Sequence, residues 1–577
     1  MATQKSGQPR SGYFEKSERQ ETWSGIPVKT VYTPQDVEHI KYSQRIGDPG
    51  HYPFTRGIYE DMYRGRLWSR RQITGCSTPK LTNERLRYLI NQGENAINVI
   101  CDQPTQIQID SDHPWAEGSV GRAGVPVNTM RDVWAIMDGI RLDEISTMLT
   151  AHSPITLPSY LLLADRHGIP YSELRVSGVI TPPTVSAPVC LYGGRLSADQ
   201  QGIPWSALSG DGNRDLLISV QEKRMKEFAD KMEFMIKNCD KMYPSNFNGY
   251  IIRETGVGAA EEIAWEFARA FEAFDMLGKR GMGIDRIAPK VSFTFSAMID
   301  LFEEIVKFRV ARKVWTRNLK ERFGATDPRS LRLKFHVNTA GIMMERQQPL
   351  INIIRAAYGA LAAVLGGTQS LQVASYDEAI AIPTEEAATI ALRTQQILAY
   401  ETGVATVADP LGGSYYVESL TEKMEAEVQR ILDTIKEMGG MTAAVTSGYI
   451  DREMEKSWLR HQQDVEDKKR IIVGVNEFTI PDEEDADVDV YHHQVDFDLV
   501  TRYIEDLKEL KSSRSKNKVK KALEGLRRAV ESEDPEILRY EMECCKATCT
   551  TGEVAGAKRL GVGLPYDPMG VLEYPFS

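Results

Sequence analysis

The sequence contains no run of about 18 apolar residues, so nothing in it is long enough to cross a membrane as a helix. Its N-terminus lacks the apolar core of a signal peptide. Positive charge is also in short supply, because 70 Lys and Arg residues face 81 Asp and Glu residues and leave a net charge of -11. This balance argues against a general nucleic-acid binder, which needs a positive surface to meet phosphates. We therefore expect a soluble, cytoplasmic protein whose anion sites are local.

Cysteine is sparse. Seven residues are spread along the chain without the spacing of a disulfide framework, which predicts reduced thiols. Cys544, Cys545 and Cys549 lie close together, but no second Cys or His pair is near them, so we interpret them as structural and predict no metal site. The sequence also lacks a Gly-x-Gly-x-x-Gly turn, which removes the usual signature of a doubly wound nucleotide-binding sheet.

The chain does contain a regular alternation of short apolar segments and helix-length periodic segments. At 577 residues it is long enough for one large domain and a second unit. Short strands separated by helices of this length predict parallel βαβ units, and about eight such units favour a closed (β/α)8 barrel, a TIM barrel. The predicted strands are residues 96–101, 144–149, 174–180, 249–252, 289–294, 331–336 and 370–374. The predicted helices are residues 81–92, 130–140, 158–167, 215–237, 259–277, 297–323 and 350–365.

Two flanking regions depart from this alternation. Residues 1–50 are polar and aperiodic and predict an extended N-terminal arm that needs a partner surface to order, before a barrel domain at residues 51–405. Residues 406–577 predict a C-terminal helical extension with one buried-strand candidate at residues 471–476. The helices expected in it are residues 420–438, 451–467, 496–511 and 517–532.

One pattern repeats inside the predicted barrel. Residues 164–178 read Ala-Asp-x-x-Gly-Ile-Pro-Tyr-Ser-x-Leu-x-x-Ser-Gly, and a closely similar pattern returns at residues 198–210. We interpret the pair as a duplicated barrel unit, of which one copy bulges from the barrel or covers its mouth.

Residues 55–78 are unusual in an acidic chain, because five arginines lie among three aromatic residues and three glycines. Arginine binds phosphate bidentately and stacks on flat rings, so this stretch suits a nucleotide-like ligand that carries phosphate. A solvated basic loop is the alternative, and the composition favours neither. The arginines are Arg56, Arg64, Arg66, Arg70 and Arg71.

The same stretch contains Thr55-Arg-Gly57, Met62, Arg66, Trp68, Arg71-Gln72 and Gly75-x-Ser77-Thr78. In this order these residues resemble the opening of the acyl-CoA-binding chain of adenosylcobalamin-dependent acyl-CoA mutases, the methylmalonyl-CoA mutase family. Further motifs of that family follow in the right order, and as a set they are specific where a single one would be weak. They are Asp102-x-Pro-Thr105, Asp110-Ser-Asp112, Gly121-x-Ala-Gly124, Gly367-Thr-Gln-Ser-Leu371, Asp377-Glu-Ala-Ile-Ala-Ile-Pro-Thr384, Asp409-Pro-x-Gly-Gly-Ser414 and Gly439-Gly-Met441.

The resemblance implies a barrel threaded along its axis by the pantetheine arm of coenzyme A, with the corrin of adenosylcobalamin covering the end where radicals form. Polar residues in the predicted strands agree with a ligand-filled bore, because an ordinary barrel is filled with Val, Ile and Leu. These residues are Ser146, Ser292, His336 and Asn338.

The contacts that this family makes to coenzyme A and the cofactor carry over residue by residue as expectations. Lys290 and Lys334 stand where the family usually has arginine, which keeps the charge and loses the bidentate fork. Glu378 and Asn338 fall where the family touches the deoxyadenosyl group, and Glu254 falls near the corrin. The other expected contacts to coenzyme A or the cofactor are Met62, Arg66, Ser69, Arg71, Ala123, Ser146, Ser292 and His336.

Three isoleucines depart from the family at the expected acyl pocket. Ile73 replaces a tyrosine that lies against substrate and cofactor. Ile251 replaces a histidine that donates to the thioester carbonyl, and Arg253 is a candidate to restore that bond. 2-Hydroxyisobutyryl-CoA mutase shares the first isoleucine but pairs it with an aspartate where this chain has Ile100. The pocket is therefore expected to be more apolar than in either relative and to suit a bulkier or branched acyl group.

One further motif bears on the acyl group. Residues 208–215, which include Asn213, resemble the glutamine-bearing motif of the family. This alignment places Lys223 where methylmalonyl-CoA mutase has the arginine that binds the substrate carboxylate.

None of the nine histidines lies in an Asp-x-His-x-x-Gly motif, whose histidine ligates cobalt in this family. The resemblance then implies a substrate-binding subunit that needs a separate small cobalamin-binding chain, in a heterotetramer of two large and two small chains. The leading hypothesis is a carbon-skeleton mutase that isomerises an acyl-CoA by a radical 1,2-rearrangement. Two alternatives stay open, a 2-hydroxyisobutyryl-CoA-type mutase and a non-catalytic scaffold that binds acyl-CoA or the cobalamin chain.

Overall fold

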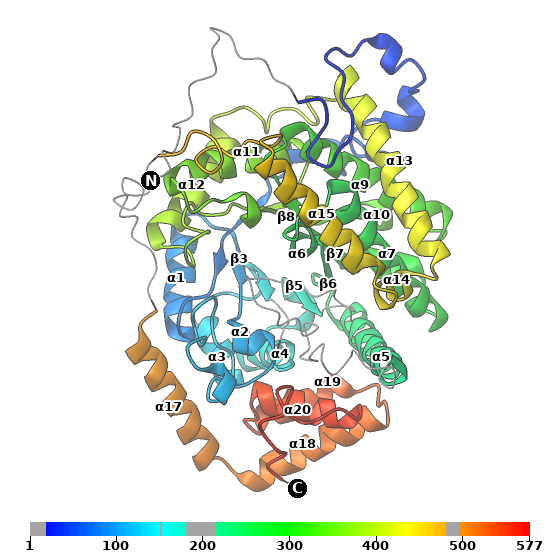
Figure 1. Cartoon of the computed structure of the whole chain (residues 1–577). Helices are drawn as coiled ribbons and strands as arrows, with labels where there is room; N and C mark the ends of the chain where they lie inside the picture. The colour runs from blue at the N-terminus through cyan, green and yellow to red at the C-terminus, as the bar shows by residue number, and fades with distance from the viewer. Residues whose placement is uncertain (1–18, 150–152, 181–213, 481–494, 577) are drawn as a thin grey trace.

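The computed structural model describes residues 19–149, 153–180, 214–480 and 495–576, and at its centre is a closed barrel of parallel strands (Figure 1). The strands are β1 (Ser69–Arg71), β2 (Ile73–Thr74), β3 (Ala96–Val99), β4 (Ser146–Leu149), β5 (Val176–Ile180), β6 (Tyr243–Asn248), β7 (Val291–Ala297), β8 (Phe335–Thr339) and β9 (Ser370–Gln372). They run in the order β1-β9-β8-β7-β6-β5-β4-β3-β2. Only Gln72 separates β1 from β2, which pair with β9 and β3 respectively, so they are two halves of one strand that closes the barrel. The predicted (β/α)8 barrel is confirmed.

Helices cover the outside of the sheet, as the alternation in the sequence predicts. They are α1 (Pro79–Asn91), α3 (Met130–Ile136), α4 (Thr156–His167), α5 (Arg214–Asn238), α7 (Ala259–Lys279), α9 (Leu301–Glu321), α11 (Asn352–Leu365) and α12 (Glu385–Tyr400). The first seven coincide with the predicted helices, with ends a few residues apart. The first copy of the repeated pattern forms the end of α4 and most of β5, and the second copy lies outside the described residues.

The strand predicted at residues 249–252 is wrong, because Gly249–Arg253 form the short helix α6. The strand of this unit, β6, ends just before that helix. Its sequence, Tyr-Pro-Ser-Asn-Phe-Asn, carries Phe247 as its only large aliphatic or phenyl side chain, so it offers no apolar run to recognise.

The buried strand predicted at residues 471–476 is also wrong. Ile471 and Val473 are 37% and 46% exposed, and the described chain has only an isolated bridge there, between Val473 and Glu477. The segment lies along α11, whose Arg355 donates to the carbonyl of Val473 at 2.6 Å. An apolar composition therefore marks a surface segment here and not a core strand.

The apolar core of the barrel lies between the sheet and its helices. Side chains alternate along a strand, and on β7 the phenylalanines face outward. Phe293 lies beside Phe247 of β6, with ring centroids 5.3 Å apart, and meets Trp315 of α9 at 5.2 Å. The alternate positions therefore face the bore, and on β7 and β8 these are Ser292, Thr294, Ser296, His336 and Asn338.

The region after the barrel is helical and has two parts (Figure 1). The first comprises α13 (Tyr415–Glu437), α14 (Met441–Thr446) and α15 (Tyr449–Glu466), and α13 packs against α7 and α9. The second part, which we call the C-terminal extension, comprises α17 (Phe497–Ser513), α18 (Lys516–Glu531), α19 (Ile537–Lys546) and α20 (Thr551–Gly561). Its α19 packs against α4 and α5.

Residues 19–50 of the predicted arm lie along helices of this same chain. Arg45 pairs with Glu425 of α13 at 2.9 Å, and the guanidinium of Arg470 lies 4.0 Å above the ring of Trp23. A partner surface is therefore not required to place this part of the arm. Among the described residues, no helix is both long enough and apolar enough to span a membrane.

A buried lysine joins α9 to α7 and the sheet. Lys307 is fully buried and donates to Glu262 Oε2 at 2.7 Å and to the carbonyl of Ser296 at 2.6 Å. We expect Lys307→Met to lower the free energy of unfolding by about 3–5 kcal/mol, because it leaves a buried carboxylate without its partner. Urea unfolding followed by tryptophan fluorescence measures this change.

The matched control is Arg430→Met, which breaks the exposed pair between Arg430 and Glu427 on α13. It should change the unfolding midpoint little, because exposed ion pairs contribute little to stability. Equal effects of the two substitutions would contradict the assignment of Lys307 to the core.

Candidate functional site

Arg71 lies in the bore of the barrel and is held by its walls. Its Nε donates to Ser370 Oγ at 3.0 Å, its Nη2 to Ser146 Oγ at 2.7 Å, and its Nη1 to the carbonyl of Ile97 at 2.8 Å. Among the described residues it forms no salt bridge. Burial lowers the pKa of Arg71 to about 10, although the charge of Glu94 acts in the opposite direction. A buried cation without a paired carboxylate is a natural partner for a polar ligand.

His336 continues this network along β8. Its Nδ1 lies 2.9 Å from Ser370 Oγ and its Nε2 lies 2.6 Å from Asn338 Oδ1. Burial lowers the pKa of His336 to about 3, and the charge of Arg71 acts in the same direction, so the ring is neutral at physiological pH. Because an amide oxygen only accepts, Nε2 carries the proton and Nδ1 accepts from the serine hydroxyl.

The opposite wall of the bore is polar as well. Asn246 Nδ2 donates to Ser292 Oγ at 3.0 Å, and Thr294 Oγ1 donates to Asn246 Oδ1 at 2.9 Å. Sequence reasoning named Ser292 but missed Asn246, Thr294 and Ser370. Thr294 could have been found, because it lies two residues after Ser292 on the same predicted strand. Asn246 could not, because the sequence did not reveal β6.

The end of the barrel where the strands begin is rich in cations. Arg64 and Arg66 are exposed, and among the described residues their side chains have no hydrogen bond or ion pair. They line an open pocket of about 670 Å³ together with Tyr63, Gly65, Leu67, Ala399, Ala405 and Thr406.

The other basic residues expected at coenzyme A lie at the same end. Lys290 precedes β7 and donates to the carbonyls of Cys239 and Asp240, at 3.0 and 2.6 Å. Lys334 precedes β8 and donates to the hydroxyl of Tyr243 at 2.7 Å. Ser69, at the start of β1, is half-buried, whereas Met62 is buried and lies against Gly57 and Gly367.

Two carboxyl groups meet at the other end, the mouth where the strands finish. Glu254 follows α6 and accepts from the amides of Gly341 and Ile342, at 3.0 and 2.8 Å. Burial raises the pKa of Glu254 to about 8 despite those bonds, and the charge of Glu378 adds to the effect. Glu378 follows β9, and burial with the neighbouring charge of Asp377 raises its pKa to about 7. Both groups therefore exchange protons near neutral pH.

The three isoleucines are all half-buried. Ile73 begins β2 and is the last bore-facing residue of the strand that β1 and β2 form together, after Ser69 and Arg71. The amide of Ile100 donates to the carbonyl of Thr74 at 3.1 Å, so Ile73 and Ile100 lie on adjacent segments. Ile251 lies on α6, on the opposite side of the barrel. Ala123 is exposed in the connection between β3 and α3.

The structure does not bring Arg253 or Lys223 into the bore. Arg253 was assigned by strand alternation, but α6 is helical, and the buried guanidinium bonds to the carbonyl of Val257 and to Glu304 at 3.1 Å. Lys223 lies on α5 and its charge acts on Glu533 of the C-terminal extension, not on the bore.

Asn213 lies outside the described residues.

The family described as Methylmalonyl-CoA mutase matches residues 21–182 and 187–563. The 2-hydroxyisobutanoyl-CoA mutase large subunit of Aquincola tertiaricarbonis is 36% identical, over 94% of this chain and 91% of its own length. The methylmalonyl-CoA mutase of Rhizobium meliloti is 34% identical, over 94% and 72%. The mitochondrial methylmalonyl-CoA mutase of Homo sapiens is 32% identical, over 93% and 68%.

The raised pKa of Glu378 predicts a pH-dependent stability. Its ordinary value is 4.5 and its value in the folded chain is about 7, so its contribution is complete below pH 4.5 and is lost as pH rises through 7. At pH 5 the side chain is neutral, like glutamine. We therefore expect Glu378→Gln to melt with the wild type at pH 5 and a few degrees above it at pH 8.5.

Thermal unfolding at the two pH values measures this difference. Glu117→Gln is the control, because Glu117 is exposed and should not separate from the wild type at either pH. A gap of the same size at pH 5 and pH 8.5 would contradict the raised pKa.

Proposed function

The chain belongs to the methylmalonyl-CoA mutase family, and we propose that it is the substrate-binding large subunit of an adenosylcobalamin-dependent mutase that rearranges the carbon skeleton of an acyl-CoA. The observation that carries this proposal is the polar bore. It leads from a cationic rim to a mouth with two carboxyl groups, and Arg71 lies in it without a paired carboxylate. A barrel filled for stability alone would present branched aliphatic residues there.

The bore suits coenzyme A in one orientation. Arg64 and Arg66 lie at the rim, and within the described part of the chain their guanidinium groups have no partner, so the phosphates of the nucleotide end would bind there. The pantetheine arm carries amides. Each Nη group of Arg71 makes one hydrogen bond in the structure and so keeps an N–H to donate to them, beside the network of His336. The acyl group would then reach the mouth beside Ile73, at the end of its strand.

The mouth fits the cofactor that the family resemblance implies. Among the described residues, Asn248 Oδ1 at the end of β6 and Ser296 Oγ near the end of β7 are buried without a hydrogen-bond partner, and the carboxyl groups of Glu254 and Glu378 lie at the same end of the barrel. This donor and acceptor set suits a ligand that brings hydroxyl groups, such as the ribose of the deoxyadenosyl group. When bound, adenosylcobalamin supplies a carbon radical by cleavage of its cobalt–carbon bond. The residues of this chain orient the acyl group, hold the carboxyl protons and exclude water.

The cobalt ligand is proposed to come from a separate small chain. No histidine of this chain lies in an Asp-x-His-x-x-Gly motif, and the relative of similar length is named a large subunit. The relatives named methylmalonyl-CoA mutase are longer, and the match spans 72% and 68% of two of them. An assembly of two large and two small chains is the expected arrangement.

The proposed substrate is a branched or bulky acyl-CoA. Ile73 and Ile100 bring two apolar side chains to adjacent segments at the mouth, and Lys223 is directed to the C-terminal extension and not to an acid group of a substrate. Among the described residues, Lys223 is therefore not placed to pair with the second carboxylate of a dicarboxylic acyl group. A hydroxylated branched acyl-CoA is the second candidate, favoured by the likeness to the Aquincola large subunit.

Two neighbouring arginines separate binding in the bore from general effects of charge. We expect Arg71→Met to weaken the binding of isobutyryl-CoA about 10- to 100-fold, because it removes charged donors from the bore. Arg70→Met is the matched control, since Arg70 lies on the opposite face of the strand and its Nε donates to the carbonyl of Gly93 at 3.2 Å. Calorimetric titration compares them, and equal losses would contradict the placement of Arg71.

Reconstitution tests the reaction itself. The chain, a cobalamin-binding small chain and adenosylcobalamin should rearrange a branched acyl-CoA faster than methylmalonyl-CoA. Ile100→Asp should raise kcat/KM for a hydroxylated acyl-CoA relative to its unsubstituted analogue by about tenfold, because the carboxylate supplies an acceptor for the hydroxyl. Binding of acyl-CoA without any rearrangement would contradict the mutase and favour a non-catalytic scaffold.

A further inference from the structure

The connection between β3 and α3 contains one wall of the proposed acyl pocket. We call residues 100–128 the pocket loop. Asp102 is fully buried and accepts from the amides of Thr105 and Gly121, at 3.0 and 2.9 Å. Val125 donates to the carbonyl of Ile100 and accepts from Asp102, both at 3.0 Å. The returning limb of the loop is therefore fixed against Ile100.

The N-terminal turn of α20 binds this returning limb. Thr551 is fully buried, and its amide donates to the carbonyl of Asn128 at 2.8 Å. Its hydroxyl lies 2.5 Å from the carbonyl of Val127 and 2.8 Å from Ser153 Oγ, just after β4. These contacts fall two and three residues beyond Val125, so one side chain of the C-terminal extension connects the pocket loop to the end of β4.

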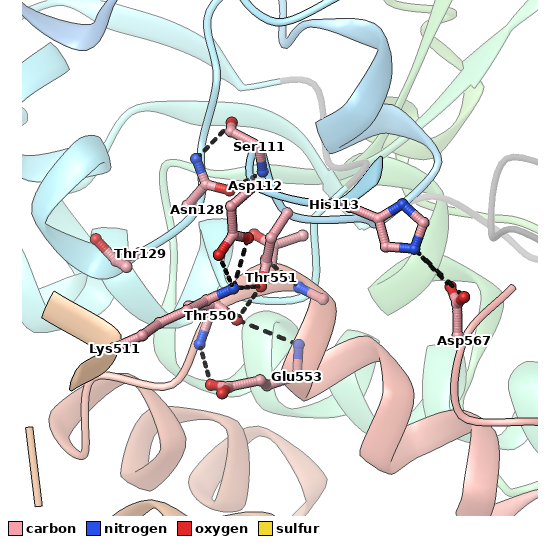
Figure 2. Close-up of polar contacts among 12 residues, drawn as sticks. Ser111, Asp112, His113, Asn128, Thr129, Lys511, Thr550, Thr551, Glu553 and Asp567 are labelled. Carbon is pink, nitrogen blue, oxygen red and sulfur yellow. Dashed lines mark hydrogen bonds and ion pairs between the residues drawn. The ribbon is translucent and has the colours of Figure 1, made fainter. Parts of the chain in front are cut away.

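Asp110 and Asp112, in the outer limb of the pocket loop, form ion pairs and hydrogen bonds with the C-terminal extension (Figure 2). Asp110 accepts from Thr550 Oγ1 at 2.6 Å and from the amide of Gly552 at 2.7 Å, at the N-terminus of α20. Lys511 of α17 lies 2.9 Å from Asp110 and 2.6 Å from Asp112. Burial acts to raise the pKa of Asp110, but Lys511 and the hydrogen bonds outweigh it and hold the pKa below its ordinary value. Figure 2 shows Lys511 directed at Asp112 beside Thr550 and Thr551.

The extension has other attachments that do not involve the pocket loop. Lys226 of α5 pairs with Glu533 at 2.7 Å, and Lys231 of α5 pairs with Glu541 of α19 at 2.8 Å. Because these contacts already attach the extension to the barrel, buried polar contacts to the loop are not needed to hold it in place. Desolvating polar groups is costly, and apolar packing would serve attachment as well.

We propose that Thr551, Asp110 and Lys511 are positioning residues, which set the place of Ile100 and so the shape of the acyl pocket from the C-terminal extension. This inference rests on the proposed function, in which Ile100 lines that pocket. None of the three touches the substrate, and each acts through the pocket loop. The extension is then a determinant of which acyl group is accepted.

Substrate discrimination tests this proposal. Thr551→Val keeps the shape of the side chain and removes its hydroxyl, and Lys511→Met removes the cation. In the reconstituted enzyme, the ratio of kcat/KM for isobutyryl-CoA to that for the bulkier pivaloyl-CoA should fall about 5- to 10-fold in both variants. Thr551→Ser restores the hydroxyl and should recover the ratio. Lys226→Met, which breaks a contact of the extension away from the loop, should leave it unchanged.

The outcomes separate this inference from the proposed function. Thermal unfolding first confirms that each variant is folded. If Thr551→Val does not fold, Lys511→Met provides the test, because Lys511 is at a partly exposed site. An unchanged ratio with kcat reduced equally for both substrates would show a purely structural role and overturn the inference alone. A wild-type chain that binds neither acyl-CoA would overturn the proposed function. An equal fall of the ratio in Lys226→Met would also overturn the inference, because loosening the C-terminal extension at any point would then change the ratio.

Discussion

The structure depends on one constraint, that a polar bore must satisfy its own hydrogen bonds. Arg71 is buried there, and its donors are met by the hydroxyls of Ser370 and Ser146 and by a strand carbonyl. Such a lining contributes little apolar burial, so the sheet must be stabilised from its outer face. The aromatic layer around Phe293 and Trp315 supplies that burial. In this barrel the apolar packing lies on the outer face of the sheet, whereas an ordinary barrel also has an apolar packed interior.

Charge along the axis gives the bore a direction. The rim where the strands begin has cations, among them Arg66 and Lys334, whereas the mouth has the carboxyl groups of Glu254 and Glu378. An elongated ligand with one anionic end is attracted to the rim and repelled from the mouth once those carboxyl groups ionise. In the proposed function, this field would orient coenzyme A and keep its phosphates away from the reacting end.

The sequence could predict what depends on local pattern and could not predict what depends on distant packing. Apolar runs such as β7 and helices such as α7 were recognisable, and so was the polar bore around His336. The strand β6 was missed because its inward residues are polar, and the error moved Arg253 from a helix to a strand. The position of Lys223 depended on an alignment across a repeat.

The bounds of the helices α19 and α20 were not predicted, although one local signal was present. Thr550 and Glu553 form a capping box, whose spacing is visible in the sequence before an apolar run. Nothing in that spacing indicates that Asp110, 440 positions earlier, accepts from the same threonine. Such a contact follows from the way the C-terminal extension folds back over the barrel, and a single sequence carries no local signal for it.

An apolar acyl pocket places more weight on shape. A site that hydrogen-bonds its substrate can reject an analogue by leaving a buried group unpaired, whereas an apolar site discriminates one methylene by only about 1–3 kcal/mol. If Ile73 and Ile100 line the acyl pocket as we propose, neither position can form a hydrogen bond that rejects an analogue. A pocket discriminates by shape only if its wall is rigid. In the proposed pocket, Ile100 lies in the connection that follows β3 and not in a strand. In our proposal, the buried contacts of Thr551 and Asp110 add to the hydrogen bonds that this connection makes within itself and hold it in place.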